Sequence, residues 1–257
     1  MPGSSVLLVG HGTSSPEGTE QFLQLVSAFA SHTGGPVAGG FIEKARPTLA
    51  EAADQILATG AAKITVLPVV LLPAGHLKDD ARAITNYLRR ENPGADIRLA
   101  RDLGVSNEIV ACLSDRIDSA GGSPDGLLVV GRGSTDPGAN SQLYAAARLV
   151  MERRPETLVE PAFVSLAPPA VAAGLDRLRR TGATEITVAP YFLFKGVLLD
   201  RIAKQAEAWS AEQGVPVRVA AELAVDPLVL RALSYRLEQA EAAAPNPNCD
   251  SCRYRRP

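Results

Sequence analysis

Short apolar runs alternate along the chain with longer stretches in which apolar residues recur every three to four positions. In the first half, the runs that resemble buried strands lie at 5–10, 36–42, 63–69 and 96–99. The stretches with a helical period lie at 17–31, 47–59, 78–91 and 105–118. Strands that alternate with helices of this length predict a parallel sheet flanked by helices, an α/β fold.

The second half of the chain repeats this pattern. Its predicted strands lie near 126–130, 158–164, 185–190 and 216–219, and its predicted helices near 138–154, 168–180, 197–213 and 226–243. The segment SVLLVGHG matches GLLVVGRG, and GGFIEKARPTLAEAADQILATGAAKITVLP matches PAFVSLAPPAVAAGLDRLRRTGATEITVAP. The offset is nearly constant, because Gly12 precedes Gly133 by 121 residues and Pro68 precedes Pro190 by 122. A duplicated unit is the simplest explanation.

The repeat predicts two similar lobes, residues 1–122 and 123–243, and a tail at 244–257 that has no apolar period. The Gly-, Ser- and Pro-rich segment SAGGSPDG at 119–126 is typical of a linker. Within the first lobe, Pro47 is expected at the start of a helix, and Gly60 just past its end.

Charge and composition point to a small-molecule partner in the cytoplasm. The 26 Lys and Arg residues nearly balance the 28 Asp and Glu residues, so no overall field favours nucleic acid or a membrane surface. The apolar run at 64–74 is too short to span a membrane, and no basic region precedes a long apolar stretch at the N-terminus. Three cysteines cannot form a disulfide framework, which agrees with a reducing compartment.

Three candidate metal ligands follow successive predicted strands of the first half. His11 follows the first strand, Glu43 ends the second and His76 follows the third. Right-handed crossovers place the carboxyl ends of parallel strands on one edge of the sheet, where ligands bind. Two imidazoles and a carboxylate at that edge would suit Co²⁺, Fe²⁺, Ni²⁺ or Zn²⁺.

Plainer interpretations compete with this one. A lone histidine at a strand end is more often a hydrogen-bonding residue. The Gly-rich turn GHGTSSPEG before a helix could instead bind an anion, although its spacing fits neither G-x-G-x-x-G nor the P-loop motif G-x-x-x-x-G-K. The second half has Arg132, Ser165 and either Val197 or Leu198 at the matching positions. This asymmetry indicates one active site in the first half, or drift after duplication. His32, in contrast, is interpreted as a surface residue.

Five motifs in order, LLVGHGT, GFIEKARPTL, LPVVLLPAGHLKDD, GRGSTDP and APYFLFKGVLLDRI, resemble those of the sirohydrochlorin chelatases of the CbiX and SirB type, which belong with the class II chelatases. The resemblance covers nearly the whole chain. It implies a two-lobed chelatase fold with the active site in the cleft between the lobes, and ATP-independent insertion of Co²⁺ or Fe²⁺ into sirohydrochlorin. The family's metal-binding and catalytic histidines correspond to His11 and His76, and Glu43 matches the acidic partner.

Chelation fits these residues chemically. Two pyrrole N–H protons must leave as the metal enters, and a neutral imidazole can hold a metal or accept a proton. We therefore hypothesise that His11 and His76 present the metal and accept protons, with Glu43 as third ligand or proton relay. Peripheral carboxylates of the substrate require cations, and the candidates are Lys44, Arg46, Lys78, Arg82, Arg132, Lys195 and Arg201. About half of these are expected to be ordinary surface residues.

The sequence leaves open the role of the cysteines, the metal and the type of function. Cys249 and Cys252 form a C-x-x-C that could hold an iron–sulfur centre between the tails of a homodimer or act as a redox-sensitive pair, whereas Cys112 is expected to be buried. Cobalt is slightly preferred over iron because of the two-lobed length and the cysteine tail. The rival function is a non-catalytic carrier of metal or tetrapyrrole.

Overall fold

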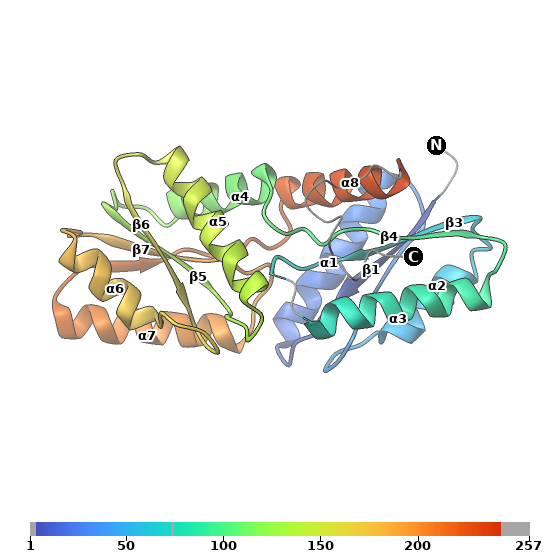
Figure 1. Cartoon of the computed structure of the whole chain (residues 1–257), viewed down its shortest axis with the longest axis horizontal. Helices are drawn as coiled ribbons and strands as arrows, with labels where there is room; N and C mark the ends of the chain where they lie inside the picture. The colour runs from blue at the N-terminus through green and yellow to red at the C-terminus, as the bar shows by residue number, and fades with distance from the viewer. Residues whose placement is uncertain (1–3, 73–74, 243–257) are drawn as a thin grey trace. The chain divides into compact units, whose positions relative to one another are not determined.

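The computed structural model of the chain describes residues 4–72 and 75–242, and the backbone alone for 75–78 (Figure 1). The first half contains one four-stranded sheet. Its elements in chain order are β1 (Ser5–Gly10), α1 (Pro16–Thr33), β2 (Val37–Phe41), α2 (Leu49–Leu57), β3 (Lys63–Pro68), α3 (Gly75–Glu91) and β4 (Asp96–Leu99). All strands are parallel, in the order β2-β1-β3-β4.

The second half repeats this arrangement. Its elements are α4 (Asn107–Ser119), β5 (Gly126–Gly131), α5 (Pro137–Arg153), β6 (Leu158–Phe163), α6 (Val171–Arg180), β7 (Ile186–Pro190), α7 (Val197–Gln213), β8 (Val217–Val219) and α8 (Pro227–Glu241). The strand order is β6-β5-β7-β8, again all parallel. The register is copied too, since Val9 pairs with Pro68 as Val130 pairs with Pro190. The α/β fold and the repeat are therefore confirmed.

The apolar runs form strands because they are buried on both faces. Every residue of the inner strands β1 and β5 is buried. Helices cover the sheets with their apolar sides, as α2 does with Ala52, Ala53 and Ile56 against the first sheet. None of the helices in the described ranges is long and apolar enough to cross a membrane.

Two helices belong to the compact unit of the other predicted lobe, namely α4 from the predicted lobe 1–122 and α8 from the predicted lobe 123–243. One unit comprises the residues up to Leu103 together with those from Leu230 onward, and the other comprises 104–229. These units differ from the expected division at 122/123. The physical reason is that helical periodicity predicts an apolar side on a helix without specifying which sheet will bury that side.

Hydrogen bonds hold each exchanged helix in its unit. In the second unit, Arg116 of α4 donates to the carbonyl oxygen of Glu222 at 3.0 Å and to that of Leu223 at 2.9 Å. Arg116 also pairs with Asp226 at 3.0 Å. In the first unit, the buried Arg236 of α8 donates to the carbonyl oxygen of Leu103 at 2.9 Å.

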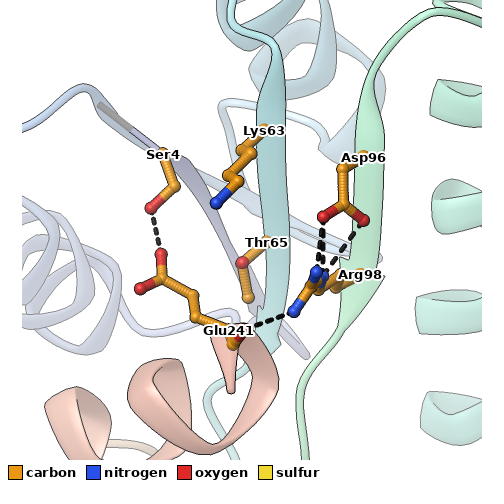
Figure 2. A pocket seen from close by; sticks show the side chains of 6 residues that line it. All are labelled: Ser4, Lys63, Thr65, Asp96, Arg98 and Glu241. Atoms are coloured by element: carbon orange, nitrogen blue, oxygen red, sulfur yellow. Dashed lines mark hydrogen bonds and ion pairs between the residues drawn. The ribbon is translucent and has the colours of Figure 1, made fainter. Parts of the chain in front are cut away.

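A polar pocket at the amino ends of the first sheet's strands secures the end of α8 (Figure 2). Arg98 donates to both carboxylate oxygens of Asp96 and to the carbonyl oxygens of Ala240 and Glu241. Ser4 donates to the Glu241 carboxylate. The side-chain hydrogen bonds from Arg98 hold the pKa of Asp96 below its ordinary value. This pocket ties a helix terminus to a sheet edge, at the edge opposite to the candidate site.

The helix after β2 begins later than the sequence predicts. Its N-cap is Thr48, whose hydroxyl accepts from the Glu51 N–H at 3.2 Å, while the Glu51 carboxylate accepts from the Thr48 N–H at 2.7 Å. This capping box fixes the start of α2 at Leu49 and leaves Pro47 outside the helix. The matching N-cap of α6 is Ala170, which has nearly the same backbone angles and no side-chain cap.

Exchanging the two N-cap residues should move stability in opposite directions. We expect Thr48→Ala to lower the free energy of unfolding by about 1 kcal/mol, because it removes the acceptor for a helix N–H. Ala170→Thr should raise it by up to about 1 kcal/mol, since the backbone there already has the N-cap conformation. Denaturant unfolding at pH 7 measures both changes, and equal effects of the two substitutions would contradict the capping argument.

The capping box should also respond to pH. Hydrogen bonds from the backbone and then the side chain of Thr48 hold the pKa of Glu51 below its ordinary value of 4.5. A lowered carboxyl pKa stabilises the fold above the unfolded-state value, and this stabilisation disappears as the pH falls through the folded-state value. The cost of Thr48→Ala should therefore be greatest near neutral pH and shrink in acid.

Candidate metal site

The strand order of the first sheet places a ligand-binding edge at the carboxyl ends of β1 and β3. The chain leaves β1 toward β2 on one side and then crosses to β3 on the other side. In open parallel sheets, ligands bind where the connections diverge in this way. His11 directly follows β1, and His76 is the second residue of α3, the helix that follows β3.

A close backbone approach brings the loops after β1 and β2 together. The Glu43 N–H donates to the carbonyl oxygen of His11 at 3.2 Å. Gly12 has a φ of 103°, and a Cβ on it would lie 1.8 Å from the carbonyl oxygen of Glu43. Only glycine fits there. The second glycine of the GHG motif therefore lets the His11 and Glu43 loops pack against each other.

The side chains of His11 and Glu43 meet at this edge. His11 Nδ1 lies 3.6 Å from Glu43 Oε1, and Lys44 Nζ lies 2.8 Å from the same oxygen. All three side chains are accessible to solvent, with 36% of the His11 side chain and 45% of the Glu43 side chain exposed. Two ligand atoms on one ion, each about 2.1 Å from it, lie roughly 3.0–3.4 Å apart. The His11–Glu43 separation is therefore close to that of two ligands of a single cation.

His76 was predicted to complete this set, and its side chain lies outside the described residues. Among the side chains that the structure describes, no three His, Cys, Asp or Glu residues are grouped for a metal ion. The structure thus brings together two of the three predicted ligands. The set of three stays a prediction.

The predicted substrate-binding cations differ in their surroundings. Lys44 pairs with Glu43, and Arg46 donates to Glu51 at 2.8 Å at the start of α2. The remaining described cations are solvent-exposed, and they are Arg82, Arg132, Lys195 and Arg201. The side chain of Lys78 lies outside the described residues, as do Cys249 and Cys252.

The second unit copies the backbone of this edge and changes its side chains. The Ser165 N–H donates to the carbonyl oxygen of Arg132 at 3.0 Å, and a Cβ on Gly133 would lie 1.9 Å from the carbonyl oxygen of Ser165. Leu198, the second residue of α7, corresponds to His76, the second residue of α3, with the same offset of 122 that relates Pro190 to Pro68. Arginine, serine and leucine therefore stand where the first unit has histidine, glutamate and histidine.

Two other residues match their sequence interpretation. Cys112 is fully buried, and burial raises the pKa of its thiol to about 12, so it is an unreactive packing residue. His32 is exposed in the last turn of α1. The Lys44–Glu43 ion pair was not predicted, because nothing in the sequence shows that residue 44 adopts a φ of 65°.

Comparison with known proteins identifies the family. A model of the CbiX family matches residues 5–120 and again 126–240, which also supports the duplication. The sirohydrochlorin cobaltochelatase of Priestia megaterium is 31% identical, over 98% of this chain and 84% of its own length. The sirohydrochlorin ferrochelatase of that organism is 28% identical, over 81% of this chain and 80% of its own length.

The fold agrees with that of a solved structure. The sirohydrochlorin chelatase SirB of Bacillus subtilis subspecies spizizenii, solved in complex with cobalt, superposes with a TM-score of 0.79. It shares 23% sequence identity, and the match covers 92% of this chain and 95% of that one. A family model matches both halves of the chain, and a relative with 31% identity matches 98% of its residues. The chain therefore belongs to the CbiX family.

Proposed function

We propose that this protein is a sirohydrochlorin chelatase, which inserts a divalent metal into sirohydrochlorin without ATP. The observation that carries the proposal is the His11–Glu43 pair, 3.6 Å apart at the ligand-binding edge of a parallel sheet, in a chain of the CbiX family. Relatives of this family are named as cobaltochelatases and ferrochelatases. Both names describe insertion of a metal into sirohydrochlorin, a reaction in which the His11–Glu43 pair could hold the metal.

The reaction exchanges one divalent cation for two protons. As the metal bonds to the ring nitrogens, two pyrrole N–H bonds break and their protons must be accepted. His11 and Glu43 would hold the incoming metal through nitrogen and oxygen atoms, with His76 as the further predicted ligand. Nitrogen and oxygen ligands on a solvent-accessible edge release a metal more readily than a thiolate set would. Once the metal has moved to the ring, the imidazoles and the carboxylate are available as proton acceptors.

We propose cobalt as the metal that this protein inserts, and iron as the alternative. The cobaltochelatase relative matches 98% of this chain, whereas the ferrochelatase relative matches 81%. Histidine and glutamate do not by themselves distinguish Co²⁺ from Fe²⁺. The preference therefore rests on the relatives and on the cysteine tail rather than on the site.

An anaerobic assay tests the function. Purified protein is mixed with an excess of sirohydrochlorin and with Co²⁺, Fe²⁺ or Ni²⁺ in turn, and the visible spectrum is followed. We expect many turnovers per protein molecule, with the highest kcat/KM for Co²⁺. Stoichiometric binding at the uncatalysed rate of insertion would instead indicate a carrier.

Reversing the charge of Arg132 should weaken substrate binding. Arg132 is exposed at the carboxyl edge of the second sheet, where a guanidinium can pair with a carboxylate of the substrate. We expect Arg132→Glu to lower kcat/KM for sirohydrochlorin about tenfold or more, mainly through KM. The matched control is Arg148→Glu, an exposed arginine within α5. An unchanged kcat/KM in Arg132→Glu would argue against the contact.

The C-terminal cysteines need a separate measurement. Cys249 and Cys252 could hold a cluster between two chains of a dimer or form a redox-sensitive pair. Iron analysis and a visible spectrum of anaerobically purified protein distinguish the two. Colourless protein without iron would exclude the cluster, and the assay above does not depend on the outcome.

A further inference from the structure

Leu166 is an exposed leucine in a left-handed backbone conformation. Its φ is 61°, and 64% of the residue is exposed, the largest exposed fraction among the large apolar residues of the described chain. A side chain with a Cβ rarely adopts this conformation, and a leucine gains nothing from water. Both features disfavour leucine here. Such an outlier suggests a functional role for the side chain.

The backbone conformation comes from the loop rather than from the leucine. Residues 165–167 are closed by a hydrogen bond from the Ala167 N–H to the carbonyl oxygen of Ser165, at 2.7 Å. The first unit closes its copy of the loop in the same way, from Ala45 to Glu43 at 2.8 Å. Lys44 occupies the matching position with a φ of 65°. The loop therefore imposes a left-handed φ on any residue at this position. Glycine or asparagine would be less strained there.

The two copies use this position differently. Lys44 reaches the carboxylate of Glu43 at 2.8 Å, so its side chain has an electrostatic partner. In the second unit Ser165 replaces the glutamate, and the neighbouring leucine presents its side chain to solvent. Val197, the first residue of α7 after β7, is 61% exposed as well. The carboxyl edge of the second sheet thus exposes two apolar side chains, each one residue away from a position that matches a candidate metal ligand of the first.

Arg132 lies in the loop that contacts the residue before this leucine, Ser165. The Ser165 N–H and the Ser165 hydroxyl both donate to the carbonyl oxygen of Arg132, each at 3.0 Å, so the two loops are in direct contact. An exposed guanidinium and an exposed aliphatic side chain on two touching loops match a flat apolar ring that carries carboxylates at its periphery. A tetrapyrrole has both features, whereas a metal ion has neither.

We propose that Leu166 is a substrate-contact residue that packs against the macrocycle of sirohydrochlorin. This inference rests on the proposed function and deepens it, because it assigns recognition of the apolar ring to the second copy of the loop. Leu166 would exclude water from the ring face, while Arg132 pairs with a peripheral carboxylate. The strain and the exposure in the free protein are then offset when the substrate binds.

Leu166→Asn separates this role from a structural one. Asparagine has a similar size and tolerates the left-handed conformation, so the variant should unfold at the same temperature as the wild type or a higher one. We expect the Kd for metal-free sirohydrochlorin, measured by absorbance titration, to rise about tenfold, the factor that corresponds to losing burial of much of a leucine side chain. KM for sirohydrochlorin should rise similarly, and KM for the metal should not change.

Leu158→Asn is the matched control. Leu158 is 39% exposed at the start of β6, at the opposite end of the strand whose loop carries Leu166. Its replacement should leave the Kd unchanged. An unchanged Kd in Leu166→Asn, with a wild type that binds and turns over, would overturn the inference alone. A wild type that binds sirohydrochlorin without inserting metal would overturn the proposed catalysis but leave the Leu166 comparison valid.

Discussion

Replacing His11 by alanine should lower the rate of metal insertion at least 100-fold while the protein stays folded. The substitution removes the nitrogen that lies 3.6 Å from the Glu43 carboxylate, and with it a metal ligand and a proton acceptor. Loss of a positioned acid–base group alone typically costs between about 10² and 10⁴ in rate. The side chain is 36% exposed, so its removal leaves no large cavity. The measurement is kcat with sirohydrochlorin and Co²⁺ under anaerobic conditions, together with the unfolding temperature.

His32→Ala is the control for this experiment. His32 is exposed in the last turn of α1, away from the loops that follow the strands. It should keep wild-type kcat and KM. Wild-type turnover in His11→Ala would show that this histidine takes no part in the reaction, and it would contradict the proposed mechanism. Loss of folding in His11→Ala, detected as a lower unfolding temperature, would mean that the side chain is structural.

Most of the secondary structure could be predicted because burial leaves a clear pattern. The inner strands β1 and β5 are covered on both faces and are therefore continuous apolar runs. The meeting of His11 and Glu43 could also be predicted, because parallel strands bring their carboxyl ends to one edge. In the structure the two side chains lie 3.6 Å apart, and their role as metal ligands stays a prediction.

Other features could not be predicted, since they depend on contacts distant in sequence. The apolar residues of α4 and α8 show that each helix packs on a sheet, but the choice of sheet depends on the whole fold. The left-handed conformations of Lys44 and Leu166 are imposed by hydrogen bonds between other residues of their loops. Comparison of the two halves can still find such positions. Where a loop is copied and its side chains are changed, the shared features reflect the backbone conformation, and the changed residues reflect the function of the site.

Gly12→Ala should both destabilise the protein and disturb the site. A left-handed φ of 103° and a Cβ that would lie 1.8 Å from the Glu43 carbonyl oxygen make two separate penalties. We expect the free energy of unfolding to fall by about 2–5 kcal/mol, the sum of conformational strain and overlap with backbone. Denaturant unfolding measures this loss.

Gly60→Ala separates the two penalties. Gly60 has a φ of 65°, and no atom lies within 4 Å of the Cβ that it would gain, so it should lose only the strain, about 1–2 kcal/mol. Gly133→Ala should lose as much as Gly12→Ala, because its Cβ would lie 1.9 Å from the Ser165 carbonyl oxygen. Equal losses in Gly12→Ala and Gly60→Ala would show that the loops part without cost. In that case the close backbone approach would not be what holds Glu43 beside His11, and another contact would have to set their separation. If the approach does hold them, Gly12→Ala must also lose metal insertion under conditions in which it stays folded, because the overlap is relieved only by separating the loops that carry His11 and Glu43.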